Sequence, residues 1–160
     1  KRRTSCLIVP EGYFSEIKIL LKFCIKISLQ DPSIPFILRL HPNVYNDRKI
    51  KSYITHKLKL FDNFEISKTC LKNDLMKSKT VLYRGSTVSI QAGCLGITPL
   101  YLKYKSEISI DPLFNLNENK LKIKNVDEFL SIHKNFRDKK FRVYCQNYYD
   151  HFDKTMLECF

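Results

Sequence analysis

No apolar run in this sequence approaches the roughly 20 residues that a helix needs to cross a bilayer, and no signal peptide is visible. The six cysteines form no CxxC pair and show no metal-ligand spacing. Three of them, Cys6, Cys24 and Cys94, fall inside apolar patterns, where cysteine behaves as a small core residue. We therefore expect reduced thiols in a cytoplasmic protein rather than a disulfide framework.

An initiator methionine is also lacking, since the sequence opens with KRRT. We therefore expect these 160 residues to be a piece of a longer chain. There is no internal repeat and no low-complexity linker. Hydrophobic residues make up 44% of the chain, which excludes wholesale disorder. The length suits one domain with a substantial core, and we expect residues 1–160 to form that single domain.

Acidic residues are scarce, with 16 against 28 basic ones, and the net charge is +12. That excess favours an anionic partner: a nucleic acid, a phosphorylated small molecule or an acidic membrane surface. The lysine-rich helix expected over residues 47–60 is by default a solvated face. It lacks the interleaved aromatics, the glycine-rich RNA motifs and the helix-turn-helix pattern of nucleic-acid binders. Nucleic acid is therefore the less favoured partner, and peripheral contact between the basic surface and a membrane stays open.

Short apolar runs of strand length alternate with helical patterns along most of the chain. We expect strands over residues 5–9, 35–40, 64–66, 80–83 and 98–102, with helices over 15–29, 47–60, 71–77 and 88–95. Later in the chain we expect a strand or ordered loop over 108–112 and helices over 126–136 and 141–160. This alternation predicts an α/β fold: a Rossmann-like, doubly wound, mainly parallel sheet with helices on both faces.

A ligand in such a sheet binds beyond the carboxyl ends of the strands, where the strand order reverses. In the doubly wound order the first strand lies between the second and the fourth. The turns after these three strands carry the most distinctive short motifs of the sequence: Pro10-Glu11-Gly12, His41-Pro42 and Arg84-Gly85-Ser86-Thr87. We expect the three turns to converge on one crevice.

The residue types in these turns suit an anionic ligand. Ser86 and Thr87 precede a helix, so they could supply an N-cap worth about 1 kcal/mol. With free helix N–H groups and Arg84 nearby they could also hold a phosphate, and both roles are compatible. His41 is either a structural residue of its turn, a donor to a phosphate oxygen, or a general acid toward a leaving phosphate.

Three further residues are candidates near the same crevice. Glu11 is either a simple turn residue or a ligand for a hydroxyl or a base edge, and Gly12 would let the backbone approach a ligand closely. Arg39 lies two residues before His41 and needs a polar partner, which would be an acid or a bound ligand.

The motifs together resemble a known pattern. Arg39-Leu40-His41-Pro42 is followed about 45 residues later by Ser86-Thr87 and then by AGCLGITPL over residues 92–100. This series resembles the C-terminal, nucleotide-sugar-binding half of GT-B glycosyltransferases, in the style of bacterial sialyl- and polysialyltransferases and of capsule or surface-polysaccharide transferases. The resemblance covers roughly residues 6–102.

The resemblance implies a role for each motif. His41-Pro42 and Ser86-Thr87 would hold the phosphate of the donor, and Glu11-Gly12 would line the donor pocket. Many GT-B families carry a glutamate after the Ser/Thr turn that binds ribose hydroxyls, and here Gln91 stands in that place. Enzymes of this kind commonly need no metal in the site, so the resemblance implies no cofactor beyond the nucleotide-sugar donor.

A GT-B enzyme closes two such domains around the reaction, and the acceptor usually binds the N-terminal one. We therefore expect this chain to bind a donor without turnover, and an inverting displacement to occur in the complete protein. Two alternatives stay open. One is a non-catalytic basic α/β module that binds nucleic acid or an acidic protein, and the other is half of a nucleotide-sugar epimerase.

Overall fold

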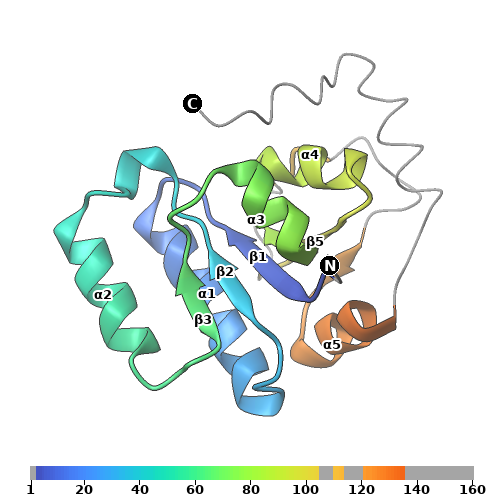
Figure 1. Ribbon diagram of the computed structural model, residues 1–160, viewed down its shortest axis with the longest axis horizontal. Coiled ribbons are helices and arrows are strands. Elements are labelled where there is room, and N and C mark those ends of the chain that lie inside the picture. Colours follow the sequence, from blue (N-terminus) through green and yellow to red (C-terminus); the bar gives the residue numbers. More distant parts are fainter. Residues whose placement is uncertain (1–2, 105–109, 114–120, 136–160) are drawn as a thin grey trace.

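The computed structural model describes residues 3–104, 110–113 and 121–135 (Figure 1). They contain one six-stranded sheet in the order β3-β2-β1-β4-β5-β6, with every neighbouring pair parallel. The strands are β1 (Ser5–Val9), β2 (Phe36–Leu38), β3 (Phe64–Ile66), β4 (Ser78–Tyr83), β5 (Thr98–Leu102) and β6 (Lys122–Ile123). The expected Rossmann-like α/β fold is confirmed, and β1 lies between β2 and β4 as the doubly wound order requires.

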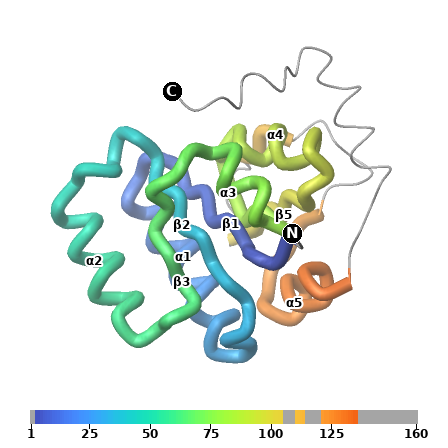
Figure 2. Tube along the Cα trace, in the orientation of Figure 1, coloured from blue at the N-terminus to red at the C-terminus, as the bar shows by residue number. Residues whose placement is uncertain are grey.

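Helices cover both faces of the sheet. One face carries α1 (Phe14–Gln30), α2 (Arg48–Leu58) and α5 (Val126–Asn135), and the other carries α3 (Leu71–Lys77) and α4 (Val88–Cys94). In Figure 1, α3 lies in front of the sheet and α1 behind it. Figure 2 shows the chain running outward from β1 to β3 and then returning to β4 and β5 on the other side of β1.

Burial on two faces explains the composition of the central strands. All five residues of β1 are buried, with Cys6 and Ile8 packing in the core under α1 and Leu7 and Val9 in the core under α3 and α4. A parallel strand covered on both sides reads as a continuous apolar run, which is why the sequence revealed it. The predicted core cysteines Cys6, Cys24 and Cys94 are buried. The expectation of reduced thiols is wrong for Cys70, which is disulfide-bonded.

The helix boundaries follow from local chemistry. The stripe of α1 buries Ile17, Leu20 and Leu21 with Cys24 and Ile27, and the helix ends before Asp31-Pro32. The α2 helix begins after Asp47, whose carboxylate accepts hydrogen bonds from the backbone N–H groups of Lys49 and Ile50 at 2.8 and 3.0 Å. Such a cap stabilises a helix by about 1 kcal/mol.

Among the strands, the structure differs from the expected elements in three places. The second strand is shorter than expected, because the chain leaves the sheet after Leu38 on its way to the turn at His41. The fourth strand begins two residues earlier than expected, because Ser78 pairs with Ser5 of β1. The two-residue strand β6 was not expected, since it is too short to show a pattern.

The later part of the chain is only partly described. The helix expected over 126–136 is α5, in which Phe129 and His133 are buried while Leu130 and Ile132 are half-buried. The helix expected over 141–160 lies outside the described residues, as does most of the segment 108–112. No helix among the described residues is long and apolar enough to span a membrane.

Candidate functional site

The structure brings the three motif-bearing turns into contact. A Cβ atom added to Gly12 would lie 3.2 Å from Nδ1 of His41, so the turn after β1 touches the turn after β2. A Cβ atom added to Gly85 would lie 2.8 Å from Oε1 of Glu11, so the turn after β4 touches the turn after β1. A side chain at either position would crowd the neighbouring turn, and the three turns meet at the carboxyl ends of β1, β2 and β4.

His41 is exposed at the start of a short 3₁₀ helix, Pro42–Val44. Its Nδ1 accepts a hydrogen bond from the backbone N–H of Asn43 at 3.2 Å. Because Nδ1 serves as the acceptor, the neutral ring carries its proton on Nε2. The turn therefore holds an imidazole whose Nε2–H is a donor, and Pro42 fixes the backbone directly after it. Asn43 is a partner that the sequence alone did not reveal.

Ser86 and Thr87 precede α4 without forming a strong cap. The Thr87 side chain makes no capping hydrogen bond, and the residue is exposed. The Ser86 hydroxyl accepts from the backbone N–H of Val88 at 3.4 Å, which is long for such a bond. The predicted N-cap role is thus weak for Ser86 and absent for Thr87, while both hydroxyls lie on a turn beside Gly85.

Arg84 is buried, with 1% of its surface exposed. Its Nε donates to a carboxylate oxygen of Glu16 at 2.6 Å, and its NH1 donates to the carbonyl oxygen of Leu102 at 3.0 Å. These contacts join the turn after β4 to the first turn of α1 and to the end of β5. The geometry makes Arg84 a support for the turn, and the sequence did not single out its partner Glu16.

Arg39 forms an ion pair with an acid, one of the two kinds of partner expected for it. Its NH1 lies 2.8 Å from Oδ2 of Asp74, which is buried, and it also donates to the carbonyl oxygen of Thr69 at 2.7 Å. Asp74 accepts two more hydrogen bonds, from the hydroxyls of Ser67 at 2.6 Å and Thr69 at 2.8 Å. This network holds the loop between β3 and α3 against the end of β2.

Gln91 lies on α4, one turn after Thr87. Its Oε1 is buried and has no hydrogen-bond partner within the part of the chain that the structure describes. A buried acceptor without a partner costs about 1–3 kcal/mol, so this oxygen is suited to accept from a bound molecule or water.

Tyr83 and Asp111 form a further buried polar contact that the sequence did not reveal. The Tyr83 hydroxyl donates to Oδ1 of Asp111 at 2.9 Å, and the backbone N–H of Leu113 donates to the same oxygen at 2.9 Å. Burial raises the pKa of the Tyr83 phenol well above its ordinary value, and the neighbouring Asp111 adds to that rise. The phenol therefore stays protonated and anchors residues 110–113 to the end of β4.

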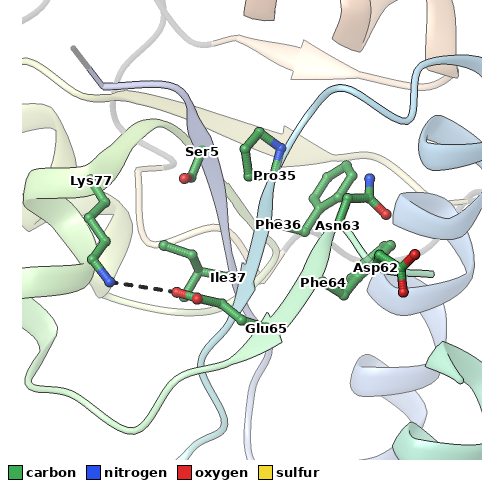
Figure 3. Close-up of a pocket in the computed structure, with 9 residues that line it drawn as sticks. All are labelled: Ser5, Pro35, Phe36, Ile37, Asp62, Asn63, Phe64, Glu65 and Lys77. Atoms are coloured by element: carbon green, nitrogen blue, oxygen red, sulfur yellow. Dashed lines mark ion pairs between the residues drawn. The ribbon is translucent and has the colours of Figure 1, made fainter.

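A pocket of about 230 Å³ lies at the amino ends of the strands, opposite the three turns (Figure 3). Its lining comes from the starts of β1, β2 and β3, including Ser5, Phe36 and Phe64. An ion pair between Lys77 and Glu65, 3.7 Å apart and well exposed, crosses its rim. Because parallel α/β sheets bind ligands at the carboxyl ends of their strands, we assign the candidate site to the three turns instead. Within residues 3–104, 110–113 and 121–135, no cluster of His, Cys, Asp and Glu could hold a metal ion.

No protein-family model and no curated protein sequence matches this chain. Solved structures do. The crystal structure of UDP-GlcNAc 2-epimerase from Neisseria meningitidis bound to UDP-GlcNAc is 16% identical over 89% of this chain and 38% of the epimerase chain, with a TM-score of 0.62. The crystal structure of TarM is 17% identical over 97% of this chain and 33% of its own, with a TM-score of 0.63.

A third similar structure is that of the glycotransferase of kitacinnamycin, at 13% identity over 92% of this chain and 39% of its own, with a TM-score of 0.55. Identities this low show a shared fold and nothing finer. The chain spans 33 to 39% of the length of these three proteins. Its fold is therefore that of one part of larger glycosyltransferase and epimerase structures.

Proposed function

We propose that this chain is the nucleotide-sugar-binding half of a GT-B glycosyltransferase that builds a surface polysaccharide or another glycan. The observation that carries the proposal is the contact among the three turns, with Gly12 against His41 and Gly85 against Glu11. The fold shared with UDP-GlcNAc 2-epimerase and with a glycotransferase supports a nucleotide-sugar as the ligand. The closer likeness to sialyl- and polysialyltransferases rests on the His41-Pro42 and Ser86-Thr87 motifs.

In this proposal the donor phosphates lie over the turns. His41 donates Nε2–H to a phosphate oxygen, and the hydroxyls of Ser86 and Thr87 donate to others. Gln91 accepts from a ribose hydroxyl through its unpaired Oε1. Glu11 and Gly12 line the pocket. Arg84 and Arg39 act by holding the turn after β4 and the end of β2 in place.

The reaction proposed for the complete protein is a direct displacement. An acceptor hydroxyl oxygen bonds to the anomeric carbon of the sugar while the bond from that carbon to the donor phosphate breaks. The nucleotide leaves with the electron pair, and donors such as His41 stabilise the charge on its phosphate. The acceptor and the base that takes its proton would come from a second domain, so we expect the 160-residue chain to bind the donor without transferring its sugar.

A thermal-shift panel of CMP, UDP, GDP and dTDP tests this proposal, with single-stranded DNA as a further ligand. A nucleotide at about 100 times its dissociation constant adds about 2.7 kcal/mol, which raises the melting temperature by several degrees. We expect one nucleotide to do so and the shift to vanish in His41→Ala and in the double variant Ser86→Ala/Thr87→Ala. His56→Ala is the matched control, because His56 is exposed on α2.

Two results would contradict the donor site. One is a shift that persists in both site variants, and the other is salt-sensitive DNA binding with no nucleotide shift. The second result would favour the basic nucleic-acid module, because binding through many phosphate contacts weakens steeply with salt.

The epimerase alternative is favoured by the likeness to UDP-GlcNAc 2-epimerase. It uses the same crevice, so nucleotide binding does not separate the two functions. The longer protein separates them, because an epimerase converts a nucleotide-sugar with no acceptor present, whereas a transferase requires one.

A further inference from the structure

A chain of buried polar contacts leads from the end of β4 to the turn of Ser86 and Thr87. It starts at Tyr83, the last residue of β4, which is 1% exposed and packs in the core under α3 and α4. A phenol hydroxyl at such a depth needs hydrogen-bond partners, because a buried polar group that is left unpaired is costly. The structure supplies two side-chain partners for it.

The first partner is Asp111, which is 3% exposed. Its Oδ1 accepts hydrogen bonds from the Tyr83 hydroxyl and from the backbone N–H of Leu113, both at 2.9 Å. A carboxylate oxygen only accepts, so the phenol proton points toward Asp111. The lone pairs of the phenol oxygen are then available to a second group that donates.

The second partner is Ser89, which lies in the first turn of α4 and is fully buried. Its hydroxyl hydrogen-bonds to the Tyr83 phenol. The same hydroxyl donates to the carbonyl oxygen of Ser86 at 2.9 Å. Because a serine hydroxyl has one proton, that proton is shared between these two acceptors. The chain of contacts therefore runs from Asp111 through Tyr83 and Ser89 to Ser86.

Ser89 holds the backbone of the turn through two hydrogen bonds. In addition to the hydroxyl, its backbone N–H donates to the Ser86 carbonyl oxygen, at 3.2 Å. Both bonds orient the peptide group that joins Ser86 to Thr87. The side chains of the turn do little to fix it, since Ser86 accepts a long bond of 3.4 Å from Val88 and Thr87 makes no capping bond. The shape of the turn therefore depends on Ser89 and on the groups that orient its hydroxyl.

We propose that Tyr83, Ser89 and Asp111 are positioning residues that hold the Ser86-Thr87 turn in the shape that binds a donor phosphate. All three are at most 3% exposed, so they act on a ligand through the turn and not by contact. Asp111 orients the phenol, the phenol orients the Ser89 hydroxyl, and that hydroxyl holds the Ser86 carbonyl group. The phosphate as the ligand rests on the proposed function, whereas the hold on the turn does not.

Amide hydrogen exchange of the full chain without ligand tests the hold on the turn. Ser89→Ala removes the hydroxyl, and Tyr83→Phe removes the phenol oxygen that orients it. We expect the amides of residues 86–90 to exchange about fivefold faster in each variant, as the loss of one hydrogen bond predicts. Ser28→Ala is the matched control, because Ser28 is a helical serine, 3% exposed, that donates to Asn63 at the amino ends of the strands. It should leave this exchange unchanged.

Nucleotide affinity tests the effect of the turn on the ligand. In a calorimetric titration with the nucleotide found by the thermal-shift panel, Ser89→Ala and Tyr83→Phe should each lose about fivefold in affinity. Ser28→Ala should lose none. Asp111→Asn keeps an acceptor for the phenol and should bind as the parent does, whereas Asp111→Ala should lose as much as Tyr83→Phe. Residues that only stabilised the fold would lower the melting temperature and leave the affinity of the folded chain unchanged.

Two results would overturn the proposal. One is amide exchange over residues 86–90 that stays at the parent rate in both Ser89→Ala and Tyr83→Phe. The other is a nucleotide affinity that is unchanged in these two variants or that falls equally in Ser28→Ala. If no nucleotide binds to the parent chain, the proposed function fails, and the exchange rates alone decide whether the three buried residues hold the turn.

Discussion

At the residue scale, the candidate site depends on two glycines that allow side chains from neighbouring turns to approach. The Gly85 position faces the flexible end of the Glu11 side chain, and the Gly12 position faces the His41 ring. Neither glycine lies in the left-handed region, so the space around it and not its backbone conformation explains the residue type. A methyl group at either position should therefore disturb the shape of the site more than the stability of the fold.

Gly85→Ala should therefore weaken nucleotide binding with little loss of stability. The new Cβ would lie 2.8 Å from Oε1 of Glu11, and that carboxylate can swing away at small cost to the fold. We expect about a tenfold loss of affinity, or about 1.4 kcal/mol, in a calorimetric titration with the nucleotide found by the thermal-shift panel.

Gly96→Ala is the control for this variant. Gly96 has φ of 68°, so alanine there should cost about 1 kcal/mol of stability and leave nucleotide affinity unchanged. Unchanged affinity in Gly85→Ala would show that Glu11 does not line the donor pocket.

At the element scale, buried polar contacts hold the secondary structure in register around the site. Arg84, directly after β4, pairs with Glu16 of α1 and donates to Leu102 of β5, and the Arg39–Asp74 pair joins the end of β2 to α3. Both join elements that are far apart in the chain. Each arginine supports a turn that carries a proposed ligand residue, so both arginines act at a distance from the ligand.

Arg84→Met should destabilise the protein by about 3 kcal/mol in urea unfolding, because it leaves the largely buried carboxylate of Glu16 without its cation and removes a donor to Leu102. The double variant Arg84→Met/Glu16→Gln should lose less than the sum of the two single variants, since the two groups interact directly.

The exposed pair of Lys77 and Glu65 supplies the comparison. Both side chains are more than half exposed, so Lys77→Met should change stability by less than about 1 kcal/mol. An Arg84→Met protein as stable as the parent would mean that the buried pair does not anchor the turn.

At the scale of the whole molecule, one buried histidine connects the two ends of the described chain. His133 of α5 lies 3.1 Å from the carbonyl oxygen of Thr4 through Nε2 and 2.8 Å from the hydroxyl of Thr80 through Nδ1. A carbonyl oxygen only accepts, so Nε2 carries the proton and Nδ1 accepts from Thr80. Burial, with the nearby charge of Lys79, lowers the pKa of His133 to about 4.

This histidine predicts loss of stability in mild acid. The folded state favours the neutral ring, while the unfolded chain has the ordinary histidine pKa of about 6.5. The contribution is complete above about pH 6.5 and is lost as the pH falls toward 4, at a cost of at most about 3 kcal/mol.

Urea unfolding at a series of pH values from 7 to about 4 measures this loss. His133→Gln removes the titrating group and should flatten the profile over that range. Parallel profiles for the parent and the variant would show that the acid sensitivity arises elsewhere.

The local elements of this protein were largely predictable from the sequence. Apolar runs marked β1, β4 and β5 because parallel strands are buried on both faces, and capping or proline residues marked the helix ends. The alternation of these elements then placed β1 between β2 and β4, and so identified which turns meet. The two-residue strand β6 carried too little pattern to be found.

The amino-acid sequence by itself determined the α/β fold, its reversal of strand order and the turns that would form the site, because short-range periodicity and turn chemistry encode each of these. Only the tertiary structure decided that Arg84 is buried on Glu16 and that Arg39 binds Asp74. The physical reason is that each of these polar side chains takes its partner from a distant segment, 68 positions away for Arg84 and Glu16. No local pattern in the sequence shows which distant segments come into contact in the fold.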